Sequence, residues 1–134
     1  MWWIDSLWVA LGAVLGANLR YGIERLVGRF LPLEFPMGTL FINVTGSFLL
    51  GAFFMWGRQH VSMNPNWRLI IAVGFCGGYT TFSSFTWESY ALYREGRWEF
   101  ALLNIFASNV LGLLAVAAGA MLVSKLTAPG HLLG

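Results

Sequence analysis

The sequence predicts an all-α integral membrane protein with four transmembrane helices. Of its 134 residues, 57% are hydrophobic and only 10% are charged, whereas a soluble domain has about 25% charged residues and about 45–50% apolar ones. The charged residues also lie far apart, and they leave four long uncharged stretches, at 6–19, 35–57, 69–87 and 100–124. Such a chain has too little polar surface to face water and enough apolar length to cross a bilayer four times.

The same composition excludes other classes of protein. The single cysteine, Cys76, cannot form a disulfide within one chain, and it has no Cys or His at a metal-ligand spacing. Eight basic and six acidic residues give a net charge of +2 and are scattered, with no run of Lys or Arg that could follow a nucleic acid backbone. We therefore expect neither a side-chain metal centre nor a nucleic acid partner.

Each uncharged stretch is assigned to one helix. A helix needs about 20 mostly apolar residues to cross the hydrocarbon core, and the last three stretches are long enough. The first becomes so only if Arg20, and with it Glu24, lies within the helix. Short connections with turn residues such as Pro32, Pro36 and Gly96 separate the helices. We expect one transmembrane domain over 1–134, with spans at 4–30, 36–57, 67–94 and 98–124.

The distribution of basic residues gives almost no signal for the orientation of the chain in the membrane. Orientation normally follows an excess of Lys and Arg on the cytoplasmic side. Here one end of the bundle receives Arg25, Arg29, Arg94 and Arg97, and the other receives Arg58, Arg68 and Lys125. Two readings stay open: a weak signal that still orients the chain, and insertion both ways with pairing of inverted copies. Inverted repeats around a midplane site are a common transport architecture, which adds weight to the second reading.

Uncharged polar residues recur in the middle of the second and fourth spans. Thr39, Asn43 and Ser47 follow one another at intervals of four and so share a helix face, as do Asn104 and Ser108, with Asn109 beside them. Amides and hydroxyls can replace the water around a small anion without holding it too tightly. They also serve as ordinary hydrogen bonds between membrane helices. Both interpretations stay open.

The third span is predicted to be interrupted at Gly77-Gly78, because adjacent glycines weaken a helix and a break would free carbonyl and N–H groups. A kink or a close helix contact is the alternative. Phe82 and Phe85 follow three residues apart, among Thr80, Thr81, Ser83, Ser84 and Thr86. Aromatic ring edges are positive and can attract an anion in a dry pathway, although such a pair is more often core packing.

Two charged residues and a glycine pair complete the set of candidates. Gly12 and Gly16 have the small-xxx-small spacing of a helix-packing face. Arg20, one turn later, either concentrates anions at a pore mouth or extends to the headgroups. Glu88 closes the polar part of the third span, as a water-exposed end residue or as a partner of the polar stripe.

Three segments together resemble the CrcB/Fluc family of fluoride channels. They are GAVLGANLRY at 12–21, GTLFINVTGSFLLG at 38–51 and GFCGGYTTFSSF at 74–85, and they occur in order across nearly the whole chain. The resemblance implies an antiparallel homodimer in a bacterial inner membrane, with two pores that conduct fluoride passively and selectively. It also implies export of cytoplasmic fluoride and protection against its toxicity.

The resemblance also implies roles for individual residues. The pore would be lined by Asn43, Phe82, Phe85 and Ser108. A polar track beside the phenylalanines would consist of Thr39, Ser83, Ser84, Thr86 and Glu88. Arg20 would lie near the aqueous vestibule. The backbone carbonyls of Gly77 and Thr80, contributed by both subunits, would hold a structural sodium ion at the dimer interface. Asn104, one turn before Ser108, stands where other members use a hydroxyl or aromatic group, and the resemblance assigns it no role.

Two other function classes are weighed against a channel. A small proton-coupled multidrug-type exporter would also form antiparallel dimers, but it needs an acid near mid-membrane, and Asp5 and Glu24 lie near the ends of the first span. An enzyme built on Ser47 lacks a histidine base, because His60 falls in a loop and His131 in the tail. We expect no catalytic activity.

Overall fold

The computed structural model describes residues 1–31, 34–60 and 62–128. All regular secondary structure in this part of the chain is helical. The elements are α1 (Trp2–Phe30), α2 (Met37–Gln59), the π-helical segment η1 (Arg68–Cys76), α3 (Gly77–Tyr79), α4 (Phe82–Arg94) and α5 (Trp98–Leu126). They form four segments long and apolar enough to cross a membrane, with η1, α3 and α4 together making the third. The expectation of an all-helical chain with four long apolar helices is confirmed within the described residues.

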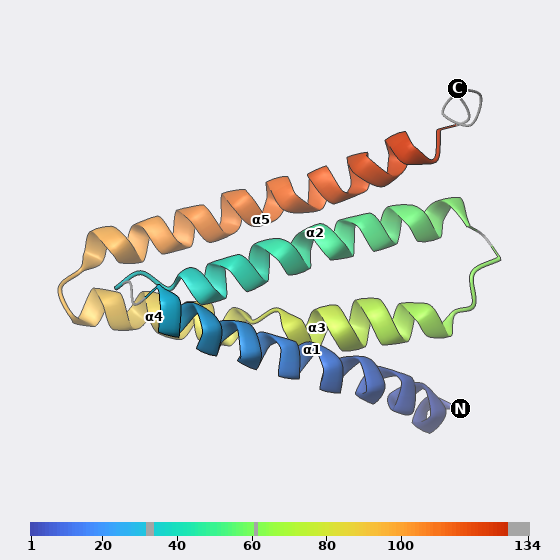
Figure 1. Ribbon diagram of the computed structural model, residues 1–134, viewed down its shortest axis with the longest axis horizontal. Helices are drawn as coiled ribbons and strands as arrows, with labels where there is room; N and C mark the ends of the chain where they lie inside the picture. Colours follow the sequence, from blue (N-terminus) through green and yellow to red (C-terminus); the bar gives the residue numbers. More distant parts are fainter. Residues whose placement is uncertain (32–33, 61, 129–134) are drawn as a thin grey trace.

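The helices are arranged in two pairs. α5 packs along the length of α2, and α1 packs along η1 and α3, while α4 contacts the first part of α5 (Figure 1). The turn from α4 to α5 is tight, and Gly96 adopts a φ of 76°, a conformation that favours glycine there. The third span therefore belongs to the pair with α1 and joins it to the other pair, since η1 and α3 also contact α2 and α4 contacts α5.

Glycines allow the paired helices to approach closely. A Cβ added to Gly12 would collide with the Ile70 carbonyl oxygen, and one added to Gly16 would collide with that of Phe75. In the other pair, Gly119 lies in the same way against the Phe48 carbonyl. The small-xxx-small pair of the first span is thus a packing face, as is common where membrane helices meet.

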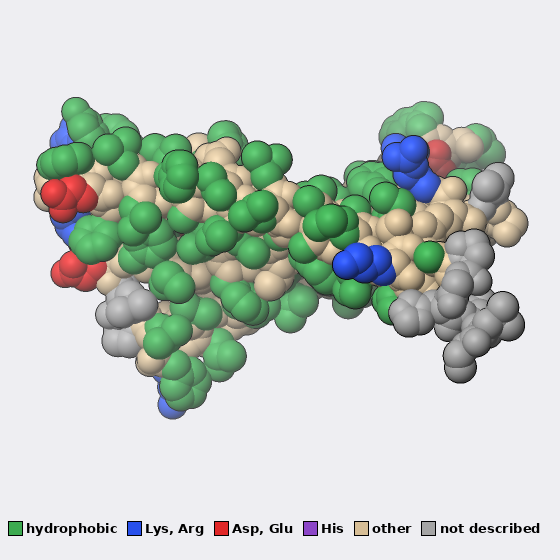
Figure 2. All heavy atoms as spheres, turned by 90° about the horizontal axis from the view of Figure 1, so that it is seen from above, with side chains coloured by type: hydrophobic (Ala, Val, Ile, Leu, Met, Phe, Trp, Pro, Cys, Tyr) green, Lys and Arg blue, Asp and Glu red, His purple; other side chains and the backbone are tan. Residues whose placement is uncertain are grey.

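The surface is apolar along most of its length. On the face shown in Figure 2, hydrophobic side chains cover the middle of the molecule, and the charged side chains gather toward its two ends. Large apolar side chains such as Leu7, Leu15, Leu113 and Leu122 are exposed. This distribution is the one a bilayer requires, because lipid contacts replace burial in a protein core.

The third span departs from helical geometry at Thr80 and Thr81, which have φ and ψ of −80° and 158° and of −147° and 114°. Gly77 and Gly78 belong to α3, so the prediction of an interruption at Gly77-Gly78 is wrong about its position. A Cβ on Gly78 would come within 2.8 Å of the Ala13 carbonyl oxygen, which makes this residue a contact point for α1 instead. The extended residues lie where another helix offers hydrogen bonds in place of the lost helical ones.

Candidate functional site

The side chain of Asn43 binds the extended backbone at Thr81 through two hydrogen bonds. Its Nδ2 donates to the Thr81 carbonyl oxygen at 3.0 Å, and its Oδ1 accepts from the Thr81 N–H at 2.8 Å. A continuing helix would have directed that N–H to the carbonyl of Gly77. The two bonds also fix the orientation of the amide, since reversing it would place oxygen against oxygen and nitrogen against nitrogen.

Asn43 faces a groove of about 300 Å³ that Ser47, Thr80, Thr81 and Phe82 also line. An amide nitrogen carries two hydrogens, and Thr81 takes one of them. The second N–H of Asn43 is a donor whose orientation the Thr81 backbone sets. The structure thus brings together Asn43 and Phe82 from the predicted pore set, together with Thr80.

Hydroxyl groups surround the first turn of α4. Thr81 Oγ1 caps this helix by accepting from the Ser84 N–H at 3.2 Å. The same oxygen lies 3.1 Å from Ser84 Oγ and 3.3 Å from Ser83 Oγ, and Thr86 Oγ1 donates to the Ser83 carbonyl at 3.0 Å. Two residues of the predicted polar track, Ser83 and Ser84, therefore contact the Thr81 hydroxyl, and a third, Thr86, lies on the same helix and bonds to the Ser83 backbone.

Phe82 and Phe85 form a tilted pair, with ring centroids 5.6 Å apart and an interplanar angle of 50°. Their environments differ, because Phe82 is 76% exposed and Phe85 only 8%. Both line a second, mainly apolar groove of about 800 Å³ between α4 and α5. Phe82 borders both grooves, the one that Asn43 lines and the one that Phe85 lines.

Ser108 is linked to the backbone carbonyl of Phe85 through two other side chains. Ser108 Oγ donates to Asn104 Oδ1 at 3.3 Å, and Asn104 Nδ2 donates to Ser89 Oγ at 3.0 Å. Ser89 Oγ in turn donates to the Phe85 carbonyl oxygen at 2.8 Å. Sequence reasoning did not identify Ser89, and the signal available was its position one turn after Phe85.

Thr39 and Glu88 meet at the other end of the third span. Thr39 Oγ1 donates to Glu88 Oε1 at 2.7 Å, whereas Glu88 Oε2 is buried without a hydrogen-bond partner among the described residues. Glu24 lines the same groove, of about 270 Å³. Glu88 is therefore a partner of the polar stripe of α2, one of the two readings of this residue.

Arg20 stands apart from these groups. It is partly exposed on α1, and it has no hydrogen bond or ion pair to another described residue. Its predicted place at an aqueous vestibule stays a prediction.

The carbonyl of Gly77, one of those expected to hold sodium, is free of its helical partner. Because the Thr81 N–H bonds to Asn43, the Gly77 carbonyl lacks its usual helical donor. Gly77 is exposed, and a Cβ added to it would meet nothing within 4 Å. A carbonyl freed in this way can replace water around a cation, so the donor set fits. No group of three or more acidic, His or Cys side chains in residues 1–31, 34–60 and 62–128 could hold a metal.

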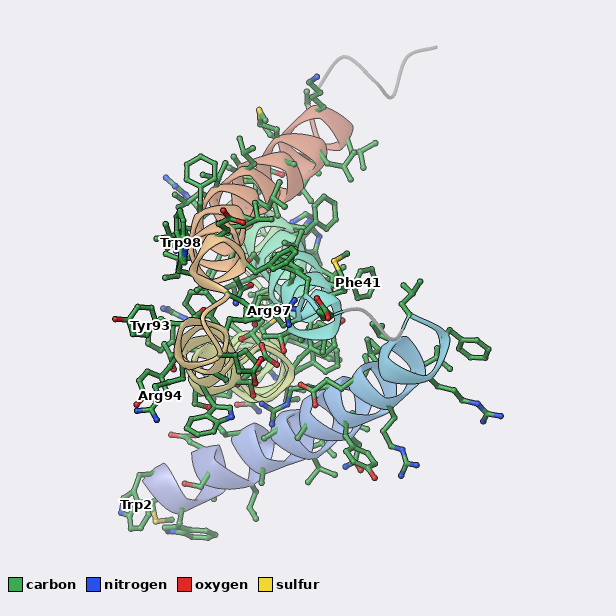
Figure 3. All side chains as sticks on the ribbon, turned by 90° about the vertical axis from the view of Figure 1, so that its left-hand side faces the viewer. Trp2, Phe41, Tyr93, Arg94, Arg97 and Trp98 are labelled. Carbon is green, nitrogen blue, oxygen red and sulfur yellow. The ribbon has the colours of Figure 1, made fainter. Side chains whose placement is uncertain are left out.

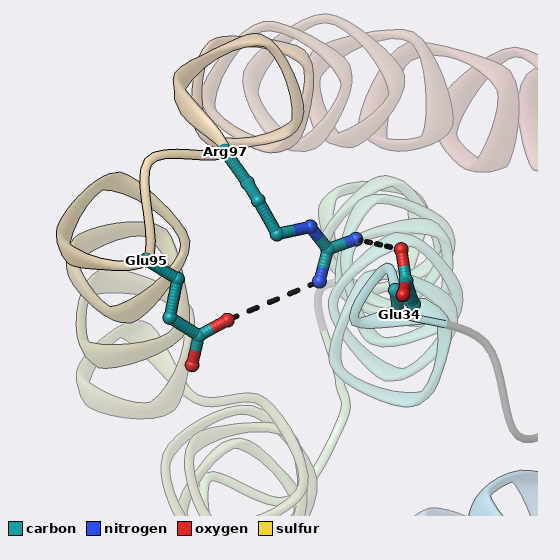
Figure 4. Close-up of polar contacts among 3 residues, drawn as sticks. All are labelled: Glu34, Glu95 and Arg97. Carbon is teal, nitrogen blue, oxygen red and sulfur yellow. Dashed lines mark hydrogen bonds and ion pairs between the residues drawn. The ribbon is translucent and has the colours of Figure 1, made fainter.

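A cluster of ion pairs lies at the end of the molecule where α5 begins. Arg97 points between the helices, whereas Tyr93 and Arg94 point away from the bundle (Figure 3). Its Nη2 lies 2.6 Å from Glu34 Oε2, and its Nη1 lies 3.9 Å from Glu95 Oε2 (Figure 4). The guanidinium also stacks 4.8 Å from the ring centroid of Phe100. These contacts connect the segment before α2 to the turn before α5.

Comparison with known proteins gives one consistent result. Residues 7–120 match the model of a family described as CrcB-like protein, Camphor Resistance (CrcB). A protein of Koribacter versatilis is 45% identical over 122 residues, covering 91% of this chain and 97% of that protein. Relatives from Solibacter usitatus and a Sulfurihydrogenibium species are 41% identical over 119 residues and 42% identical over 118. The alignments cover 89% and 88% of this chain and 98% and 95% of those proteins. All three relatives are named fluoride-specific ion channel FluC.

Proposed function

Because the chain belongs to the CrcB family, we propose that it is a fluoride-selective channel. Its four apolar helices and this family make it a multi-pass membrane protein. The proposed activity is passive export of fluoride across a bacterial inner membrane, which protects the cytoplasm from fluoride toxicity. The relatives carry the name of a channel, so the alternative of a proton-coupled exporter is not favoured.

One observation supports a pore at Asn43: its amide is held on both sides by Thr81. A preorganised donor loses little when it meets an anion, because its orientation has already been set. The remaining Nδ2 hydrogen would donate to fluoride beside the ring of Phe82, whose positive edge adds a second attraction. Phe85 would extend this path along the wider groove, and Ser108 would join it from α5.

The hydroxyls on α4 would carry fluoride past the rings. Ser83, Ser84 and Thr86 lie on α4, which begins at Phe82, and Glu88, the partner of Thr39, lies further along the same helix. Their donors would substitute for water along a path that excludes it. Arg20 would raise the local anion concentration at the mouth.

We further propose that two copies associate in opposite orientations, which the nearly balanced basic residues support. Phe82 is 76% exposed on a single chain, and a ring in a dry pathway needs a covering surface. A second copy would supply it, giving two equivalent pores. The carbonyls of Gly77 and Thr80 from both copies would then surround a structural sodium ion, which would hold the two third spans together.

The test is ion efflux from liposomes that contain the purified protein, recorded with a fluoride electrode and with a chloride control. We expect fast fluoride release and negligible chloride release. Phe82→Ile is expected to abolish fluoride release, whereas Phe106→Ile, which changes an exposed ring outside both grooves, is expected to retain it. Correctly folded wild-type protein that releases neither ion would contradict the proposal.

A further inference from the structure

Asn104 is the residue of α5 that the family resemblance leaves without a role, and it is completely buried, with 0% of its surface exposed. A buried amide is costly unless its polar atoms are paired. Both ends of this amide are paired, to Ser89 on α4 and to Ser108 on its own helix. Hydrogen bonds therefore hold this enclosed amide in place, and the donor and acceptor of each bond follow from the chemistry of the groups.

The direction of each bond follows from the carbonyl at one end. The Phe85 carbonyl can only accept, so the Ser89 hydroxyl must give it its one hydrogen. Ser89 Oγ can then only accept, which requires Nδ2 of Asn104 to face it. Oδ1 of Asn104 consequently faces Ser108, whose hydroxyl must donate. The backbone of the Phe85 turn thus sets the direction of the Ser108 hydroxyl through two intervening side chains.

From this chain of bonds we propose that Asn104 is a positioning residue that couples the Ser108 hydroxyl to the Phe85 turn during conduction. The proposal rests on the proposed function, because it assigns Ser108 and Phe85 to the pore. Asn104 itself, being fully buried, does not touch the ion.

The longest of the three hydrogen bonds is the one made by Ser108, the residue that is proposed to line the pore. Ser108 Oγ to Asn104 Oδ1 is 3.3 Å, against 3.0 Å and 2.8 Å for the two bonds beyond it. Since a longer hydrogen bond is weaker, an arriving anion would turn the Ser108 hydroxyl away from Asn104 before disturbing the rest. Asn104 Oδ1 would then lose its partner in a buried place, and this cost would help the ion to leave. A binding site in a channel needs such a limit on its affinity.

The test is a double-mutant cycle of fluoride efflux from liposomes, with Asn104→Leu, Ser108→Ala and the pair. Residues that act through one network give non-additive effects. We expect each single variant to slow efflux about tenfold and the double variant to be no slower than the slower single variant. Multiplied effects, about a hundredfold in the double variant, would overturn the proposal, as would an Asn104→Leu variant that conducts at the wild-type rate. A merely structural role would lower the unfolding temperature without producing this coupling to Ser108.

A second variant covers the case in which Asn104→Leu does not fold. Ser89→Ala removes one hydroxyl and cuts the chain of bonds between Asn104 and Phe85, so it is expected to slow efflux and to be non-additive with Ser108→Ala. Additivity of Ser89→Ala with Ser108→Ala would overturn the coupling by itself. Asn18→Leu is the matched control, because the exposed Asn18 amide bonds only within its own helix, to the Val14 carbonyl at 2.7 Å. It is expected to conduct at the wild-type rate.

The two proposals fail in different ways. If the wild-type protein does not release fluoride, the channel assignment fails. If the wild-type protein conducts and Phe82→Ile does not, but the cycle is additive, the channel stands and the role of Asn104 is refuted.

Discussion

The amide of Asn43 on α2 pairs with both backbone polar groups of Thr81, so that a side chain replaces helical hydrogen bonds where the third span is extended. This relation connects the stability of the third span to a residue expected in the pore. Asn43 would therefore have two tasks, to hold Thr81 and to present its remaining N–H to the ion.

Replacing Asn43 by leucine tests both tasks. The change leaves the N–H and C=O of Thr81 without these partners in a part-buried place, so we expect a loss of about 2–4 kcal/mol in the free energy of unfolding. Thermal unfolding in detergent measures the stability, and fluoride efflux measures conduction, which we expect to fall. Asn18→Leu is the control with the same chemical change. An Asn43→Leu protein that matches the wild type in both measurements would refute the paired role.

Substitutions at the two phenylalanines are expected to affect stability and conduction differently. Phe85 is nearly buried, so Phe85→Ala is expected to lower the free energy of unfolding by about 3–5 kcal/mol. Phe82 is largely exposed on the chain, and Phe82→Ile is expected to leave the unfolding temperature nearly unchanged while fluoride efflux is lost. Unfolding followed by circular dichroism, together with the liposome assay, distinguishes them. Equal destabilisation by both variants would contradict this separation of the two rings.

Gly16 gives a test of the α1 packing with an internal control. Gly16→Val places a Cβ against the Phe75 carbonyl and is expected to separate α1 from η1. Overpacking a close contact typically costs about 1–3 kcal/mol and sometimes more, so we expect the free energy of unfolding to fall by at least this amount. Gly22 lies on the same helix, and a Cβ there would meet nothing within 4 Å. Gly22→Val should therefore fold like the wild type. The relative yields of folded protein and the unfolding temperatures of the two variants decide the matter.

The Arg97 cluster should stabilise the fold little through the ion pair with Glu34 and more through the packing of Arg97 on Phe100. Glu34 is 75% exposed, so Glu34→Gln is expected to cost less than about 1 kcal/mol, and less still at high salt. Arg97→Ala also removes the stacking on Phe100 and should cost more, by about 0.5–1 kcal/mol for a cation–π contact. Unfolding at low and high salt measures both. A larger effect from Glu34→Gln than from Arg97→Ala would contradict this ordering.

Some of the contacts among these polar side chains could be foreseen, because residue types and helical spacing carry the information. Uncharged polar residues in apolar spans indicated where side chains meet, and Thr39 does bond to Glu88. Ser89 was missed, since one serine in a polar stretch looks like any other until Asn104 is brought against it. The different exposure of Phe82 and Phe85 was also beyond prediction, because spacing alone places both rings on one face.

By itself the sequence determined the four apolar helices and the glycine packing face of α1, because hydropathy and residue spacing act locally along the chain. Only the tertiary structure decided where the third span is extended. Adjacent glycines weaken a helix, but an interruption is stable only where its freed groups find partners. That partner is Asn43, 38 residues away on another helix, and so the extended residues are Thr80 and Thr81, while Gly77 and Gly78 stay helical.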